Sequence, residues 1–337
     1  MSKVDEPNTH ATSDATDGFA YWVPLVCPAL RPLTETITRN LSIDSPEKVS
    51  QVHKHMCTPG PTWTGVVPSE VEGIGTLYSP ANEGGEDESS ASALLYFHGG
   101  GRIMGCSNGA NEAVACSRIV CGLGIAVLSV EYRLAFPDAL DDAVEAYRWL
   151  ARRMESRGGC RPAAIAVAGE SAGGGIAAEL CQRLLDEKRR GVAGADSTPA
   201  CQILIYPMLD DRTCMNEKLC KVPGHLVWNN KSNMYAWSTY LGPDHEPGDE
   251  SLPQYASASR REDLTDLPPA YIQVGNIELF RDEDAEYTQR LRDAGVEVEF
   301  NEVKGAFHGV MTMGRDDTPV VEAWAEIVRF AKKYLVN

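Results

Sequence analysis

Residues 165–180 read IAVAGESAGGGIAAEL and place four glycines around Ser171, where an apolar strand pattern runs into a helix pattern. Glycine inside regular structure costs about 0.5–1 kcal/mol relative to alanine. A chain that gathers glycines beside a hydroxyl therefore uses them for a backbone geometry that other residues cannot adopt. This stretch decides the fold class, and the remaining motifs are interpreted in relation to it.

The segment Gly169-Glu170-Ser171-Ala172-Gly173 matches G-x-S-x-G, the nucleophile elbow. In such a turn the serine backbone is strained, so that the hydroxyl stands clear at the top of the sheet. Side chains two residues before and two residues after the serine would collide with the turn. The serine also precedes a helix, whose N-terminus favours negative charge. We therefore predict that Ser171 is a nucleophile.

A competing interpretation starts from the same glycines. Residues 173–178 match G-x-G-x-x-A, a weak dinucleotide-binding fingerprint, which requires an acidic residue at the end of the following strand. The next strand pattern ends instead in Ile205-Tyr206-Pro207. This interpretation also leaves Ser171 without a role, so the nucleophile elbow is favoured.

A second glycine run, His98-Gly99-Gly100-Gly101, follows an apolar strand 73 residues before the serine. Backbone N–H groups in such a loop can point at a tetrahedral oxyanion, together with the N–H of the residue after the nucleophile. The pair of motifs predicts an oxyanion hole made by Gly99, Gly100 and Ala172.

The base and the acid follow later in the chain. Of the seven histidines, His308 alone lies downstream at the end of a late strand, 137 residues after the serine. For the acid, Glu278 and Asp282 both follow the strand at residues 270–275. Glu278 is nearer the strand end, whereas Asp282 could cap the next helix. The order serine, acid, histidine is the one for this fold, and we predict Glu278 as the acid, with Asp282 as the alternative.

Strand and helix patterns alternate along most of the chain. Strands are expected at 93–97, 125–132, 164–169, 202–209, 270–275 and 296–303, and helices at 110–121, 138–154, 172–187, 282–295 and 320–335. Such alternation predicts an α/β fold with a mostly parallel central sheet and helices on both faces. Residues 19–60 and 209–260 break the alternation. We predict a disordered leader at 1–18 and a catalytic domain at 61–208 and 261–337, with the segments 19–60 and 209–260 placed to cover the carboxyl edge of its sheet.

The composition excludes several classes of function. The 337 residues carry a net charge of −17, which argues against nucleic-acid partners and anionic membrane surfaces. No apolar run reaches the roughly 18–20 residues of a membrane span, and the polar start MSKVDEPNTHATSDATDG lacks a signal-peptide core. A cytoplasmic protein is expected. The ten cysteines form no C-x-x-C pair, so reduced thiols are expected and no metal site is indicated.

Together these motifs resemble the hormone-sensitive-lipase-like α/β-hydrolases, also called bacterial family IV esterases. The likeness covers roughly residues 90–335 and is carried by FHGGG, SVEYRLA, FPDALDDAVEAYRWL, GESAGG, IYPML, LPPAYIQVG, ELFRDE and GAFHG. It implies a Ser171–His308 pair, the same oxyanion donors, and a helical cap over the site, formed by residues 19–60 and 209–260. It also implies esters of short or medium acyl chain as small-molecule substrates, with no metal or organic cofactor. A homodimer is left open.

The sequence departs from the family pattern near the site. Glu278 stands where the family typically has aspartate, and Glu170 precedes the nucleophile where aspartate is common. Arg102 follows HGGG where the family commonly has an aromatic residue, which suggests a more polar or anionic substrate. The aromatic-rich stretch with Trp228, Met234 and Trp237 is interpreted either as a wall of the substrate pocket or as a helix packed on the main domain.

These observations favour a serine hydrolase that cleaves carboxylic esters through a Ser-His-Glu triad. Three alternatives stay open because a fold does not determine the chemistry. The triad could cleave a lactone, a carbamate or an amide, or it could catalyse an elimination or a cyclisation. The scaffold could also serve as a non-catalytic ligand receptor, although such proteins usually lack a triad member and this chain has all three.

Overall fold

One mixed sheet forms the centre of the computed structural model, which describes residues 17–39, 41–81, 92–156, 164–192, 197–222, 224–313 and 319–336. Within these residues eight strands pair in the order β1-β2-β4-β3-β5-β6-β7-β8. β1 and β2 are antiparallel to their neighbours, and all pairs from β4 to β8 are parallel. The strands are β1 (Val66–Val71), β2 (Gly75–Pro80), β3 (Ser92–Phe97), β4 (Ala126–Val130), β5 (Ala164–Glu170), β6 (Gln202–Ile205), β7 (Ala270–Gly275) and β8 (Val298–Val303).

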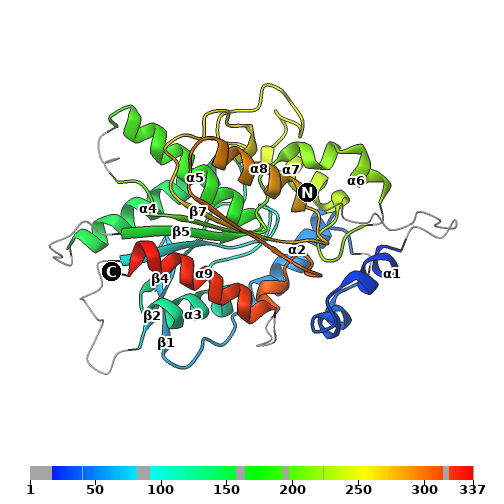
Figure 1. Cartoon of the computed structure of the whole chain (residues 1–337), viewed down its shortest axis with the longest axis horizontal. Helices are drawn as coiled ribbons and strands as arrows, with labels where there is room; N and C mark the ends of the chain where they lie inside the picture. The colour runs from blue at the N-terminus through cyan, green and yellow to red at the C-terminus, as the bar shows by residue number, and fades with distance from the viewer. Residues whose placement is uncertain are drawn as a thin grey trace.

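Helices cover both faces of this sheet (Figure 1). The helices α4 (Asp138–Ser156), α5 (Ala172–Arg189) and α8 (Arg281–Asp293) lie on one face, and α3 (Ala110–Leu123) and α9 (Val320–Leu335) lie on the other. Each face has its own apolar core, because alternate strand residues point to opposite sides. The predicted α/β-hydrolase fold class is confirmed.

The strand order brings the sequence motifs to one edge of the sheet. The HGGG run follows β3, Ser171 follows β5, Glu278 follows β7 and His308 follows β8. These four strands are parallel, so their carboxyl ends lie at the same edge. Ligand sites of open α/β sheets form at that edge.

The two irregular segments contact each other. The first contains α1 (Gly18–Trp22), η1 (Val23–Leu25), η2 (Arg31–Thr36) and α2 (Pro46–Met56). The second contains η3 (Asp211–Met215), α6 (Glu217–Lys221), α7 (Asn230–Leu241) and η4 (Ala258–Arg260). The Ile43 N–H donates to Ser232 Oγ at 2.8 Å, and Asn229 Nδ2 donates to the Leu41 carbonyl at 2.8 Å. The cap boundaries stay a prediction.

Most predicted elements differ from the observed ones by only one or two residues at an end, and the end of β6 differs by more. The strand expected over 202–209 ends at Ile205, because Tyr206 takes a positive φ of 36° and the chain turns toward the serine. Helix α1 begins at Gly18, the last residue of the predicted leader, and the Asp17 side chain caps it by accepting from the Phe19 N–H at 3.0 Å. Residues 1–16 of the leader lie outside the described residues.

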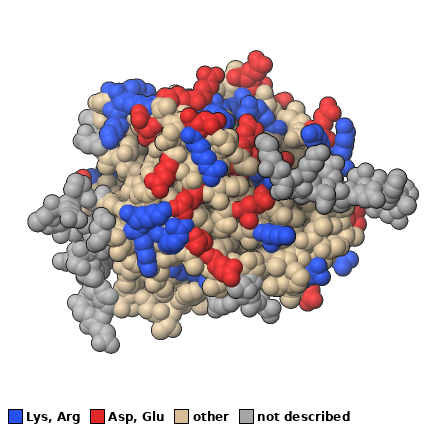
Figure 2. All heavy atoms as spheres, viewed as in Figure 1, with Lys and Arg blue, Asp and Glu red and all other residues tan. Residues whose placement is uncertain are grey.

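Acidic and basic side chains are interspersed on the face drawn in Figure 2. The cysteines whose side chains are described, eight in number, are all free thiols. In the described part of the chain, none of the helices combines the length and the apolar character needed to cross a membrane.

Candidate active site

Ser171 sits in a sharp turn between β5 and α5. Its backbone has φ 53° and ψ −119°, a conformation that costs about 1–3 kcal/mol for a residue with a side chain. Two hydrogen bonds hold it there: the Ser171 N–H donates to the Ile205 carbonyl at 2.9 Å, and the Ser171 carbonyl accepts from the Met208 N–H at 2.9 Å. The end of β6 therefore fixes the strained serine from both sides.

The glycines of the elbow leave room for close backbone contacts. A Cβ on Gly169 would lie 2.3 Å from the Gly173 carbonyl oxygen, and a Cβ on Gly173 would lie 2.1 Å from the Phe97 carbonyl oxygen. These contacts bear out the steric reason for glycine at both positions. They also place the start of α5 directly against the end of β3, where the HGGG run begins.

We expect Gly173→Ala to destabilise the fold by about 3 kcal/mol or more, because the added methyl group would push two fixed backbones apart. The matched control is Gly191→Ala, at a left-handed position with no atom within 4 Å of an added Cβ. Its loss is expected to be about 1–2 kcal/mol. Urea unfolding of both variants measures the difference, and equal losses would contradict the steric argument.

The three predicted triad side chains form one hydrogen-bonded chain. Ser171 Oγ lies 2.9 Å from His308 Nε2, and His308 Nδ1 lies 2.5 Å from Glu278 Oε2. All three side chains are buried. With Nδ1–H donating to the carboxylate, Nε2 is left free to accept the serine proton.

The structure brings Glu278, and not Asp282, to the imidazole. The Asp282 carboxylate is 74% exposed and pairs with the neighbouring Arg281. Burial raises the pKa of Glu278, while the adjacent His308 opposes that shift. Aromatic rings of Tyr206 and Phe280, with centroids 4.8 Å and 5.2 Å from that of the imidazole, exclude water from the pair.

The loop after β3 turns back on itself. The Gly100 carbonyl accepts from the N–H groups of Ile103 and Met104 at 3.2 Å and 3.1 Å. Gly100 has φ 117°, and a Cβ there would lie 2.0 Å from the Met104 carbonyl oxygen, so the turn requires glycine. Among the loop and turn hydrogen bonds of the described residues, none is donated by the N–H of Gly99, Gly100 or Ala172. An oxyanion hole at these three groups, which stays a prediction, requires them to be free of other acceptors.

His98 anchors the start of this loop. Its ring is fully buried, stacks on Tyr132 at 4.1 Å, and lies with Nδ1 2.8 Å from the Gly99 carbonyl oxygen. The Tyr132 hydroxyl in turn donates to the His98 carbonyl at 2.7 Å. Burial lowers the pKa of His98 to about 4, although Glu131 opposes the shift. The imidazole is therefore neutral at pH 7, and its Nδ1–H donates to Gly99.

We expect His98→Asn to weaken the acid sensitivity of the fold. The folded-state pKa lies below the ordinary 6.5, so the unfolded chain takes up the proton first and stability falls as pH drops from about 6.5 to about 4. For a pKa of about 4, His98 accounts for roughly 2 kcal/mol of the loss between pH 7 and pH 5. Asparagine can keep the bond to Gly99 without titrating. Urea unfolding at both pH values should show that the variant loses roughly 2 kcal/mol less than the wild type; equal losses would contradict the assignment.

Comparisons with known proteins show which family the chain belongs to. A family model described as "alpha/beta hydrolase fold" matches residues 94–312. The chain belongs to the α/β-hydrolase family. Among curated relatives, Esterase LipI of Mycobacterium tuberculosis is 34% identical over 233 residues, which cover 66% of this hydrolase and 67% of LipI. Lipase 2 of a Moraxella species is 28% identical over 279 residues, which cover 75% of this chain and 64% of Lipase 2, just under two thirds of its length.

Among solved structures, a bacterial heroin esterase superimposes with a TM-score of 0.78 at 29% identity. The superposition covers 94% of this hydrolase and 99% of that chain. These relatives place the chain in the hormone-sensitive-lipase-like group, as the sequence predicts.

Arg102 of this hydrolase does not face a substrate, so the suggested anionic or more polar substrate loses its basis. The guanidinium is fully buried and makes two bonds to the Glu179 carboxylate, at 3.0 Å and 2.7 Å. Burial opposes the charge of Arg102, but the carboxylate of Glu179 raises its pKa overall. A guanidinium already neutralised by a buried carboxylate has no charge left to offer an anion.

Glu170, beside the nucleophile, also has an internal partner. Its carboxylate is buried and accepts from the Tyr206 hydroxyl at 2.8 Å. A Cβ on Gly99 would lie 3.4 Å from Glu170 Cγ, in ordinary van der Waals contact with this side chain. Burial raises the pKa of Glu170, and the Tyr206 bond opposes the shift. Sequence analysis missed Tyr206, whose only signal is its place at the end of β6.

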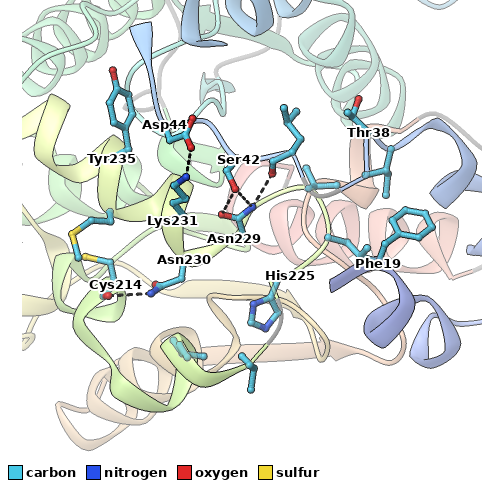
Figure 3. A pocket seen from close by; sticks show the side chains of 18 of the residues that line it. Phe19, Thr38, Ser42, Asp44, Cys214, His225, Asn229, Asn230, Lys231 and Tyr235 are labelled. Carbon is cyan, nitrogen blue, oxygen red and sulfur yellow. Dashed lines mark hydrogen bonds and ion pairs between the residues drawn. The ribbon is translucent and has the colours of Figure 1, made fainter. Parts of the chain in front are cut away.

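A cavity of about 840 Å³ opens between the two irregular segments. Figure 3 shows Phe19, Thr38, Ser42 and Asp44 from the first segment facing Cys214, His225, Asn229 and Lys231 from the second. Its walls combine apolar side chains with the Asp44–Lys231 ion pair and the Ser42–Asn229 hydrogen bond.

His225 is a cavity residue that sequence analysis missed. It is buried, stacks on Trp22 at 4.3 Å, and its pKa is lowered to about 4 by burial and by the charge of His308. The cavity is thus lined by a neutral imidazole, and the charge of the triad histidine contributes to its lowered pKa. No local motif marks His225, because its neighbours come from a distant segment.

The three predicted pocket residues take different places. Met234 lines the cavity. Trp228 lies between the loop and the triad: its ring centroid is 6.5 Å from that of His308, and a Cβ on Gly101 would lie 2.3 Å from its ring edge. Trp237 is fully buried and packs on Arg102. The substrate role of these residues stays a prediction.

Proposed function

We propose that this protein is a serine carboxylesterase that hydrolyses small esters of short or medium acyl chain through an acyl-enzyme on Ser171. The observation that carries the proposal is the unbroken hydrogen-bonded chain from Glu278 through His308 to the Ser171 hydroxyl. The curated relatives, named as an esterase and a lipase, support the ester class.

In the first step Ser171 Oγ attacks the ester carbonyl carbon, and the C=O π pair moves onto oxygen as an oxyanion. His308 Nε2 takes the hydroxyl proton, and Glu278 stabilises the imidazolium. The N–H groups of Gly99, Gly100 and Ala172 hold the oxyanion. When the carbonyl re-forms, the C–O bond to the alcohol breaks and His308 gives the proton to the leaving alkoxide.

In the second step a water molecule replaces the alcohol. His308 Nε2 takes a proton from the water as its oxygen attacks the acyl carbon, and a second tetrahedral oxyanion forms at the same donors. Collapse breaks the bond to Ser171 Oγ, which recovers its proton from His308. The acid leaves and the hydrogen-bonded triad is restored.

In this proposal residues 19–60 and 209–260 act as the cap, and the cavity between them, which none of the triad residues lines, binds the part of the substrate that lies beyond the triad. Its volume of about 840 Å³ falls in the range of small-molecule sites, about 300–1,000 Å³. The neutral His225 and the apolar wall residue Leu226 suit an uncharged ester.

A fluorophosphonate probe and a p-nitrophenyl ester series together test the proposal. We expect the probe to label the wild-type protein, with the adduct on the peptide that contains Ser171, and p-nitrophenyl acetate and butyrate to turn over faster than the palmitate. Labelling without turnover of any ester would favour a lactone, a carbamate, an amide or a non-hydrolytic reaction. Neither labelling nor turnover would favour a receptor and overturn the proposal.

A further inference from the structure

We infer that Arg102 is a positioning residue for the proposed reaction: its buried side chain holds the glycine loop 99–101 in register with the nucleophile helix α5 and with α7. The inference rests on the proposed ester hydrolysis, because it concerns the donors of the oxyanion hole. Arg102 touches no reacting atom and acts through the backbone of the loop that it follows.

The first observation is the bidentate pair that joins the loop to α5. Arg102 Nη1 and Nη2 donate to the two oxygens of Glu179 at 3.0 Å and 2.7 Å, and neither side chain has exposed surface. Glu179 lies on the helix whose first residue, Ala172, is a predicted oxyanion donor. A planar fork on a carboxylate fixes orientation as well as distance, so the pair sets the loop relative to that helix.

The second observation is a third anchor in the segment just after β6. Arg102 Nη2 also donates to the Met208 carbonyl at 3.1 Å, and the Met208 N–H donates to the Ser171 carbonyl at 2.9 Å. One peptide segment thus contacts the guanidinium on one side and the nucleophile turn on the other. The loop that carries Gly99 and Gly100 and the turn that carries the serine share this support.

The third observation is the aromatic packing from α7. The guanidinium carbon lies 4.6 Å from the Trp237 ring centroid and 4.7 Å from that of Tyr240. Both rings are buried. Cation–π contacts that are shielded from water are worth more than exposed ones. Helix α7 therefore contributes to the position of the loop, and this contact accounts for the burial of Trp237.

The fourth observation explains one of the four glycines around Ser171. A Cβ on Gly175 would lie 2.3 Å from Arg102 Nη2 and 2.2 Å from the Met208 carbonyl oxygen. Gly175 therefore provides the space that the guanidinium and the Met208 carbonyl occupy together.

The backbone of the loop needs such an anchor. Gly100, Gly101 and Arg102 all have positive φ, at 117°, 62° and 67°. Glycine has more conformational freedom to lose than any other residue, and a left-handed conformation is unfavourable for arginine. A side chain held at five points selects one conformation of this run. Oxyanion donors act efficiently only when they are already in place.

The test separates positioning from simple stabilisation with Arg102→Met, Arg102→Lys and the double variant Arg102→Met/Glu179→Met. Replacing both members of a buried ion pair by apolar residues often restores stability that the single change loses. We expect the double variant to recover stability relative to Arg102→Met but to keep a kcat for p-nitrophenyl acetate about 10- to 100-fold below wild type. KM should change less than about threefold, because the donors act mainly on the transition state.

An alkyl trifluoromethyl ketone gives a second readout, since the serine adds to its carbonyl and forms a tetrahedral oxyanion. Its inhibition constant should rise by about the same factor as kcat falls. Arg102→Lys, which keeps the charge but lacks the planar fork, should show the same loss. If Arg102→Met does not fold, Arg102→Lys serves as the test variant in its place.

The matched control is Arg260→Met. In the wild type Arg260 also makes a bidentate pair, with bonds of 2.7 Å and 2.6 Å to the fully buried Asp211 carboxylate. Loss of this pair should leave kcat within about twofold of wild type.

A double variant with wild-type kcat and wild-type affinity for the ketone would overturn the inference and leave the proposed esterase function standing. So would a stable Arg102→Lys variant with unchanged kinetics. A wild-type protein that neither turns over the ester nor reacts with a fluorophosphonate would overturn both, because the oxyanion hole would then have no reaction to serve.

Discussion

Ser171→Ala is expected to lower ester turnover by about 10⁶-fold and to abolish labelling by a fluorophosphonate. The change removes the only atom that forms the acyl bond in the proposed mechanism. What remains is the oxyanion hole and substrate binding, which leave about 10³–10⁴-fold acceleration over water. The fold should survive, because the backbone bonds from Ser171 to Ile205 and Met208 do not involve the hydroxyl.

The measurement is the rate of p-nitrophenyl acetate hydrolysis, together with mass spectrometry of the labelled protein. Ser156→Ala serves as the control, since within the described residues that hydroxyl bonds only to the Arg153 carbonyl on the helix surface, at 2.8 Å. It should leave both readouts unchanged. Retained turnover in a folded Ser171→Ala protein would show that another residue carries the acyl group, and the proposed mechanism would be wrong.

Glu278→Gln is expected to lower kcat by about 10⁴-fold with little change in fold stability. Glutamine has the same shape, but its amide can present N–H groups to His308 Nδ1, 2.5 Å away in the wild type. The imidazole then carries its proton on Nε2, where it can no longer accept from the Ser171 hydroxyl. The loss therefore comes from the wrong tautomer rather than from a missing side chain.

The matched control for this prediction is Asp282→Asn, which removes a carboxylate four residues away that pairs with Arg281 on the surface. Its kcat should stay within about twofold of wild type, as expected for a surface pair. Steady-state kinetics of both variants decide between the two acids that the sequence left open. A large loss in Asp282→Asn with an active Glu278→Gln would reverse the assignment.

Local sequence predicted the parts of the site whose geometry depends on a few neighbouring residues. The elbow requires glycine at positions 169 and 173 because any Cβ there meets backbone within 2.3 Å. The turn at Gly100 has the same kind of requirement. Such steric requirements can be recognised in the sequence, because only glycine satisfies them.

The local sequence did not predict the direction of the Arg102 side chain. From its place after HGGG we expected a more polar or anionic substrate, yet the side chain turns inward to Glu179, 77 residues away. Trp237 and Tyr240, which cover the same guanidinium, come from a further segment. The identity of a charged residue beside a predicted site does not reveal whether its side chain faces the substrate or the core. Its direction depends on partners that no local pattern names.

The sequence alone determined the α/β alternation, the strained turn at Ser171, the glycine loop and the order of serine, acid and histidine, since backbone sterics and hydrophobic periodicity act over a few residues. Only the tertiary structure decided that Glu278 rather than Asp282 meets His308, that the cavity lies between two segments distant in sequence, and that Arg102 is a buried support. Those outcomes depend on the strand order and on which side chains the packed helices bring within bonding distance.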